Sequence, residues 1–198
     1  MRVSARADYA LRAAVELAAA VERGSGPVTR EAIASAQKVP LKFLESVLLE
    51  LKHVGIVRSH RGAAGGYSLA RDAAQITIAD VLRAVDGPMA NVRGERPELV
   101  EYPGPAAPLR EVWIAVRASL RGLLEATTIA DVVADRLPEH LLELTREPEA
   151  WISLGRVRGP ADAGLRVIAE ARPAPTAGGP SARASRTAAR RPRSRSRG

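Results

Sequence analysis

Residues 59–71 read SHRGAAGGYSLAR, and the interpretation of the whole chain depends on this stretch. It joins two short runs that favour β-strands, residues 56–60 and 67–70. The tip between them, RGAAGG at 61–66, contains glycines, which adopt the positive φ angles of a tight connection. The stretch therefore predicts a two-stranded antiparallel hairpin with one arginine, Arg61, beside its narrow tip.

Three helices are predicted before this hairpin. The first covers residues 4–23, and Ser4 is a suitable N-cap. Thr29 caps a second helix over 30–37, and the third runs over 41–55 after a proline that suits a first helical turn. A longer helix followed by two short helices joined by a tight turn is typical of a helix-turn-helix. With a hairpin directly after it, the pattern predicts a winged helix.

The apolar residues of these helices recur at helical spacing and define their inward faces. They are Tyr9, Leu11, Ala14, Val15, Ala18 and Val21 in the first helix, Ile33 and Ala34 in the second, and Leu44, Val47, Leu48, Leu51 and Val54 in the third.

The rest of the chain is also predicted to be mainly helical. Thr77 and Asp80 form a capping-box pattern at the start of a fourth helix over 78–87. A loop rich in proline and glycine follows, and after it a long amphipathic helix at 108–126 has an apolar stripe too wide for one short domain to cover. Further helical segments are expected at 128–137 and around EHLLEL.

We therefore expect a mainly α fold with four parts. Residues 1–87 form the winged helix-turn-helix domain, and residues 88–107 form an irregular loop without cysteines. Residues 108–154 form a dimerisation helix with a helical extension. Residues 155–198 lose periodicity and become an Arg-rich, low-complexity tail, whose composition predicts disorder.

The net charge of +8 is located mainly in that tail. Residues 172–198 hold eight arginines and no acidic residue, so residues 1–171 are neutral as a whole. Residues 1–72 nevertheless carry eleven basic and seven acidic residues, whereas residues 73–171 carry eleven and fifteen. The basic part of the folded chain is therefore the first third, which contains the predicted hairpin.

Several other classes of protein are disfavoured. The chain has no cysteine, which excludes disulfides, thiolate metal sites and cysteine nucleophiles, and its three histidines are scattered. No apolar run approaches the ~20 residues of a membrane span, and the N-terminus has charges where a secretory signal would be apolar. We expect a cytoplasmic protein with no membrane contact. GAAGG lacks the lysine and the following helix of a phosphate-binding loop, so an enzyme is not expected.

The third helix has an outward face that could read DNA. The N-terminal half of the second helix of a helix-turn-helix enters the major groove. Lys42 could contact phosphate or guanine there, and Glu45 could accept a hydrogen bond from cytosine N4. The other outward residues are Ser46, Leu49 and His53. An ordinary solvated face with mixed charges is the alternative, and this helix alone does not decide between the two.

The hairpin favours the first of these interpretations. In a winged helix the wing lies beside the phosphate backbone, and Arg61 could enter the minor groove, where the negative potential is strongest. The small residues from Gly62 to Gly66, with Gly65 among them, would let the backbone approach DNA without collision. In isolation the same glycines would indicate a plain turn.

The chain resembles the Rrf-two family of bacterial winged-helix transcription regulators, over roughly residues 1–135. That family includes the iron–sulfur cluster regulator and the nitric-oxide-sensing repressor. The resemblance is carried, in order and spacing, by DYALRA (8–13), LA (17–18), IA (33–34), VPLKFLESVLLEL (39–51), GIVRSHRGAAGGYSLAR (55–71), ITIADVLRAVDG (76–87) and PLREVW (108–113). The glycine-rich hairpin is its most distinctive part.

The resemblance implies a homodimer that binds palindromic promoter sites, with a long helix at 108–126 crossing to its partner and Trp113 in the dimer seam. The implied dimer residues are Leu109, Val112, Trp113, Val116, Leu120 and Leu123. It also implies that Lys42, Phe43, Glu45 and Ser46 face the major groove and Arg61 the minor groove. The predicted DNA-binding set is completed by Ser4, Thr29, Gly62, Gly65 and Gly66.

The chain departs from its cluster-binding relatives in the loop before the long helix. Those members place three cysteines there, and this loop has none. Asp8 matches an acidic position that some members use as a ligand, but a carboxylate without thiolates does not hold an iron–sulfur cluster. We therefore expect no cofactor and no metal, and we interpret Asp8 as a surface residue or a charge partner within the first helix. The protein would therefore sense another signal, such as a small-molecule effector, or no signal at all.

Two functional hypotheses follow. The first is a sequence-specific, homodimeric DNA-binding regulator that represses by blocking promoter access, with operator half-sites about one helical turn apart or a multiple of it. The second is a winged-helix interaction module that binds protein and no longer reads DNA. The presence of Lys42, Glu45 and Arg61 favours the first.

Overall fold

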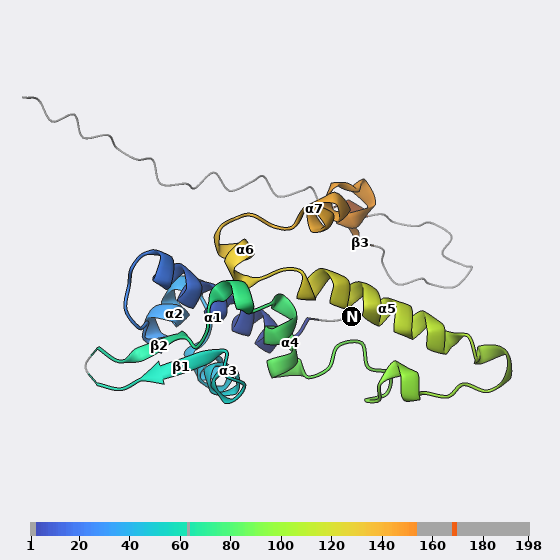
Figure 1. Cartoon of the computed structure of the whole chain (residues 1–198), viewed down its shortest axis with the longest axis horizontal. Coiled ribbons are helices and arrows are strands. Elements are labelled where there is room, and N and C mark those ends of the chain that lie inside the picture. The colour runs from blue at the N-terminus through green and yellow to red at the C-terminus, as the bar shows by residue number, and fades with distance from the viewer. Residues whose placement is uncertain (1–2, 63, 154–167, 170–198) are drawn as a thin grey trace, which may run out of the picture. The chain divides into compact units, whose positions relative to one another are not determined.

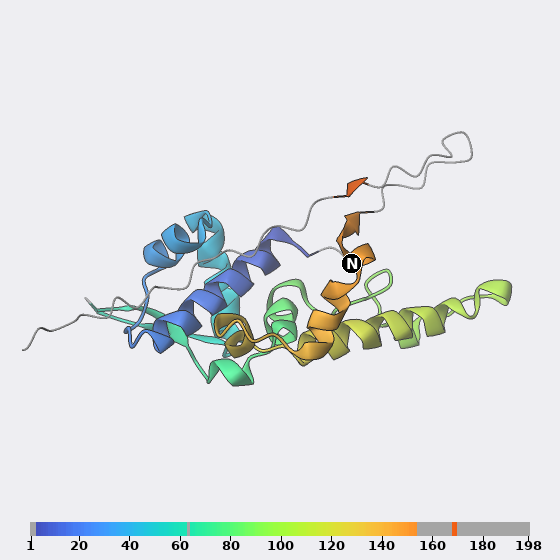
Figure 2. The ribbon, with the colours of Figure 1, turned by 90° about the horizontal axis from the view of Figure 1, so that it is seen from above.

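The computed structural model describes residues 3–62, 64–153 and 168–169, in two compact units that divide at residue 147. The first unit contains all the long elements (Figures 1 and 2). Its helices are α1 (Ala5–Glu22), α2 (Arg30–Gln37), α3 (Leu41–His53), α4 (Ile78–Asp86), α5 (Leu109–Glu125), α6 (Ile129–Val133) and α7 (Glu139–Arg146). Its strands are β1 (Val57–His60) and β2 (Gly66–Leu69). In the second unit, β3 (Ile152–Ser153) pairs with β4 (Ile168–Ala169). Apart from these last two residues, the expected Arg-rich tail lies outside the described residues.

Helix α1 is the centre of the first unit, because α2, α3, α4, α6 and β2 all contact it. Its buried face consists of small residues, with Leu17 the largest among alanines such as Ala10 and Ala14. Neighbouring helices can approach closely only where the side chains are short. The prediction that Val21 faces inward is wrong. Val21 is the penultimate residue of α1, and it is 62% exposed.

Helix α3 packs on α1 through Leu44, Val47, Leu48 and Leu51, all of which are fully buried as predicted. Val54 was expected in this row but is 53% exposed. It is the C-cap residue of α3, where the chain leaves the helix and turns toward β1, so its side chain no longer follows the inward face.

The hairpin predicted from residues 56–70 is confirmed as an antiparallel pair. Val57 lies opposite Leu69, and His60 lies opposite Gly66. Val28, in the segment before α2, pairs with β2 in the manner of a short third strand. Tyr67 N donates to Val28 O at 2.8 Å, and Val28 N donates to Tyr67 O at 2.9 Å. This exchange connects the wing directly to the start of the helix-turn-helix.

Helices α4 and α6 begin with the same five residues, TIADV, at 77–81 and 128–132. Each copy forms a complete capping box. The two copies lie antiparallel and exchange backbone hydrogen bonds, from Ile78 N to Thr127 O and from Ile129 N to Ile76 O, both 2.9 Å. Ile129 is fully buried in the same core as α1 and α3. The chain thus returns from α5 to the winged helix.

Helix α5 has no fully buried residue within the described unit. Its apolar stripe remains partly exposed along its length, and it contacts α4 and the preceding loop. That loop is anchored by the buried side chains of Pro97 and Val100, next to a short 3-10 turn at Pro97–Leu99. Among the described residues, no helix combines the length and apolar character needed to cross a membrane.

Candidate nucleic-acid interface

The N-terminal half of α3 presents an exposed face, and the helix itself lies beside strand β1 of the wing (Figure 1). Lys42, Phe43, Glu45 and Ser46 are all exposed on it, as the sequence predicted for a face turned away from the core. Ser46 Oγ donates to the carbonyl of Phe43 at 2.9 Å, which leaves the hydroxyl oxygen able to accept. Lys42 makes no hydrogen bond or ion pair among the described residues, so its ammonium group can reach an anionic partner.

Phe43 is half-exposed at the edge of this face. Its ring lies 6.2 Å from that of Tyr9 on α1, at an interplanar angle of 49°. Tilted aromatic pairs at such distances are favourable. The contact holds the Phe43 ring in place while 50% of the residue remains exposed.

Glu45 has a partner that sequence reasoning missed. The guanidinium of Arg30, at the start of α2, pairs with Glu45 Oε1 through Nη1 and with Glu31 Oε1 through Nε at 2.7 Å. Glu31 and Glu45 in turn raise the pKa of Arg30. The pair balances the negative charge of Glu45, which would otherwise disfavour an anionic partner. Helical periodicity gave no signal for this contact between two helices.

The wing tip is exposed at both Arg61 and Gly62. Arg61 makes no hydrogen bond or ion pair with any described residue. Gly65 and Gly66 are constrained by the protein itself: a Cβ on Gly65 would lie 2.7 Å from His60 O, and one on Gly66 would lie 2.6 Å from Val28 O. These two glycines are therefore required by the protein itself. Gly65 allows the tight turn of the hairpin, and Gly66 allows the wing to pack against the segment before α2.

The remaining two residues of the predicted DNA-binding set act as helix caps. Thr29 Oγ1 accepts from Ala32 N at 3.2 Å. Ser4 Oγ accepts from Ala7 N at 3.0 Å and donates to Asp86 Oδ1 at 2.7 Å, which connects the start of α1 to the end of α4. Their hydroxyls thus have structural partners within the chain.

The stripe on α5 predicted for dimerisation is partly exposed. Leu109, Val112, Trp113 and Val116 are among the exposed large apolar residues of the described chain, and Leu120 and Leu123 are half-buried. The first four lie within two turns of one another, so the N-terminal half of α5 carries a continuous apolar surface.

Comparison with known proteins places these elements in a family. The model of the Rrf2 family (the Rrf-two family), described as "Iron-dependent Transcriptional regulator", matches residues 3–135. The chain belongs to this family. The match extends from α1 through α6, so it includes the winged helix, the loop and α5. The protein is a DNA-binding transcription regulator with a winged-helix fold.

Curated Rrf2 relatives cover most of the described chain. A protein of Mycobacterium tuberculosis, named as an HTH-type transcriptional regulator, is 48% identical over 151 residues, which is 76% of this chain and 92% of the relative. The HTH-type transcriptional regulator CymR of Bacillus subtilis is 34% identical over 134 residues, covering 68% of this chain and 91% of CymR.

Solved Rrf2 structures have the same fold. The structure of CymR, the global cysteine regulator of B. subtilis, superposes with a TM-score of 0.57 at 32% identity, and covers 68% of this chain and 97% of CymR. The structure of IscR from T. potens superposes with a TM-score of 0.54 at 29% identity, and covers 68% of this chain and 88% of IscR.

The iron in the family description does not fit the donors of this chain. The chain has no cysteine, and the described residues contain no group of three or more His, Asp or Glu side chains that could hold a metal ion. Asp8 Oδ2 instead pairs with Arg12 Nη2 at 2.8 Å, one turn along α1, as the charge-partner interpretation expected. No step of the function below therefore involves iron.

Proposed function

We propose that the protein is a homodimeric repressor that binds a palindromic operator through α3 and the wing. The observations that carry the proposal are the exposed Arg61 at the wing tip and the exposed N-terminal half of α3, the helix that contacts strand β1 of the wing. Because this arginine has no partner among the described residues, it is available for the minor groove. The α3 face supplies groups that could contact base edges in the adjacent major groove.

The dimer follows from the apolar half of α5. A two-fold related pair of such helices would cover both stripes and place two reading helices on one side of the assembly. The operator would then consist of two inverted half-sites about one helical turn apart or a multiple of it. Occupying such a site within a promoter blocks access of the polymerase, which is why we propose repression.

We expect Arg61→Ala to weaken operator binding about tenfold, and Glu45→Gln to relax the base preference at one position of each half-site. Removing a bidentate or groove interaction costs about 1–3 kcal/mol. The measurement is selection of bound sites from random DNA by the full chain, followed by titration of the selected duplex at one fixed salt concentration. Arg146→Ala is the matched control, because it removes an exposed arginine of α7 that belongs neither to the proposed DNA-binding residues nor to the apolar stripe of α5. Parent-like site preference and affinity in both test variants would contradict the assignment.

We expect truncation after residue 171 to weaken binding to selected and random duplexes by the same factor. The removed segment holds eight arginines and no acidic residue, and the attraction of arginine to phosphate is independent of sequence. The slope of log affinity against log salt concentration should become shallower by about 0.9 for each phosphate that the shortened chain no longer neutralises. A full-length variant with these eight arginines changed to glutamine separates charge from length. An unchanged slope in both would show that the tail does not touch DNA.

A further inference from the structure

A cavity of about 500 Å³ lies between α4, the 88–108 loop and α5. Its charged lining consists of Arg83 from α4, Arg96 and Glu98 from the loop, and Arg117, Arg121 and Glu125 from α5. Pro88 and Met89 add an apolar wall. Pro97, between Arg96 and Glu98 of this lining, is buried and anchors the loop.

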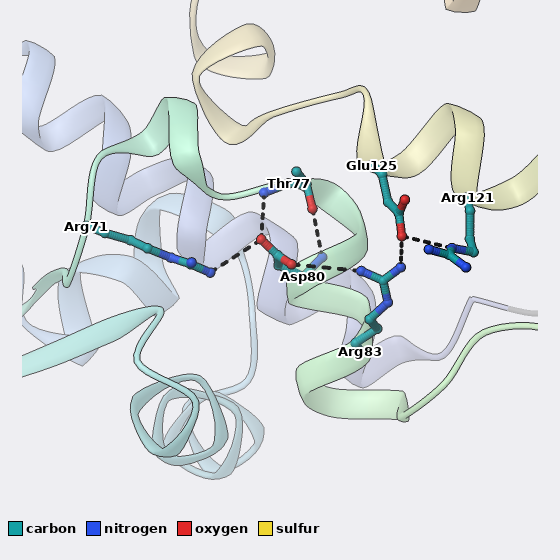
Figure 3. Close-up of polar contacts among 6 residues, drawn as sticks. All are labelled: Arg71, Thr77, Asp80, Arg83, Arg121 and Glu125. Atoms are coloured by element: carbon teal, nitrogen blue, oxygen red, sulfur yellow. Dashed lines mark hydrogen bonds and ion pairs between the residues drawn. The ribbon is translucent and has the colours of Figure 1, made fainter.

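The cavity carries an excess of positive charge. Arg83 and Arg121 share one carboxylate, with Arg121 Nε 3.0 Å from Glu125 Oε1 and Arg83 Nη2 on the same oxygen (Figure 3). Arg117 Nη1 lies 2.5 Å from Glu98 Oε2. The guanidinium of Arg96 has no hydrogen bond or ion pair among the described residues. Four guanidinium groups therefore face two carboxylates, and the difference is two positive charges.

Both carboxylates are held in the ionised form. Hydrogen bonds from Arg83 and then Arg121 lower the pKa of Glu125. The backbone N–H of Glu98 and then Arg117 lower the pKa of Glu98, and the charge of Arg96 adds to this effect. At neutral pH both carboxylates of the lining are therefore already negatively charged, and the net charge of the lining remains positive.

The ion pairs of this cavity continue to the base of the wing. Arg83 Nη1 lies 3.9 Å from Asp80 Oδ1, and Arg71 Nη2 lies 3.3 Å from Asp80 Oδ2 (Figure 3). Asp80 Oδ2 also accepts from Thr77 N at 3.2 Å in the capping box of α4. Arg71 follows β2 by two residues, so alternating charges connect Glu125 of α5 to the end of the wing strand.

We propose that this cavity binds a small dianion with carboxylate or phosphate oxygens, and that the dianion competes with Glu125 for Arg83 and Arg121. Guanidinium forks match the oxygen geometry of both groups, and a charge of −2 balances the excess. A neutral ligand would leave the excess positive charge uncompensated, and a cation would be repelled. The cavity volume is within the usual range for small-molecule sites.

Binding of the dianion would regulate DNA affinity, a part of the inference that rests on the proposed function. Withdrawing Arg83 from Glu125 breaks the side-chain connection between α4 and α5. It also changes the partner of Asp80, which holds Arg71 at the base of the wing. Ligand and DNA would therefore weaken the binding of each other by the same factor.

The first test measures the ligand without DNA. Titration calorimetry on the full chain uses succinate and inorganic phosphate as probes, succinamide as the neutral isostere of succinate, and sodium chloride to keep ionic strength constant. We expect at least one of the two anions to bind, succinamide not to bind, and Arg96→Gln to lower the affinity about tenfold or more, since a hydrogen bond to a charged group contributes about that much. The anion that binds more tightly identifies the chemical class.

Arg93→Gln is the matched control for this titration. Arg93 is an exposed arginine of the same loop, lies over the ring of Tyr102 at 5.9 Å and does not line the cavity. We expect it to bind the anion as the parent does. Absence of binding by both anions, or equal affinity in Arg96→Gln and the parent, would overturn the site.

The second test measures coupling by fluorescence anisotropy with a selected duplex at constant ionic strength. Saturating anion should weaken DNA binding by the parent about fivefold or more, and the same weakening in Arg96→Gln should need at least about tenfold more anion. An unchanged parent affinity would refute the coupling. If the chain selects no DNA at all, the proposed function fails and the calorimetric result still decides the site.

Discussion

Val116→Asp is expected to convert the proposed dimer to a monomer. Val116 lies in the apolar half of α5 and is 42% exposed in the single chain, so the fold of the protomer tolerates a carboxylate there. In a helix pair the same carboxylate would be buried without a partner, which costs about 3–5 kcal/mol. The dimer dissociation constant should therefore rise more than about a hundredfold.

Sedimentation equilibrium over a range of concentrations measures this change, and circular dichroism checks that the helices remain. Ala118→Asp is the matched control. Ala118 is exposed on the opposite side of α5 from Val116, since two residues along a helix correspond to about 200°. It adds the same charge outside the stripe and should leave the dimer intact. A dimer that persists in Val116→Asp would place the interface elsewhere.

The effect of the monomeric variant should also be visible on DNA. Two linked half-site contacts bind with an effective concentration that a monomer lacks. Val116→Asp should therefore bind a duplex with two inverted half-sites no more tightly than a duplex with one. The parent and Ala118→Asp should retain a strong preference for the paired site.

Gly66→Ala is expected to lower the free energy of unfolding by about 2–3 kcal/mol. The added Cβ would lie 2.6 Å from Val28 O and 2.7 Å from Val28 C, both backbone atoms that cannot rotate away. Val28 exchanges two backbone hydrogen bonds with Tyr67, and the next residue, Thr29, caps α2. The methyl group would therefore push the wing away from the helix-turn-helix.

Urea denaturation measures this effect through the transition midpoint at an unchanged slope. Gly26→Ala is the control, because Gly26 is two residues from Val28 and a Cβ there meets nothing within 4 Å. It should be neutral or slightly stabilising, as alanine restricts the unfolded chain more than glycine. Equal midpoints for the two variants would show that the wing relaxes without cost. DNA affinity should fall in Gly66→Ala, since the wing and α3 no longer keep their relative position.

Much of the fold could be predicted because its signals are local. Helix starts follow from caps such as Thr29 and Thr77, and the wing follows from glycines between two β-prone runs. The outward position of Glu45 follows from helical periodicity alone. Each of these features depends on residues within one or two turns, which a sequence displays directly.

Predictions were wrong or incomplete where packing between segments decided the outcome. Val21 and Val54 carry the apolar character of inward residues, yet both lie at helix ends and remain more than half exposed. The two TIADV segments, at 77–81 and 128–132, are identical and can be recognised in the sequence. Their mutual pairing, and the burial of Ile129 against α1, depends on how the chain returns after α5.

The sequence by itself determined the family, the winged helix, the absence of thiolate ligands and the apolar stripe of α5. Only the tertiary structure decided that Arg30 pairs with Glu45, that Gly66 packs against Val28, and that four arginines from three segments face one cavity. The physical reason is the range of the interactions. Caps, turns and periodicity act between near neighbours in the chain, whereas an ion pair or a cavity depends on side chains that folding brings together from distant positions.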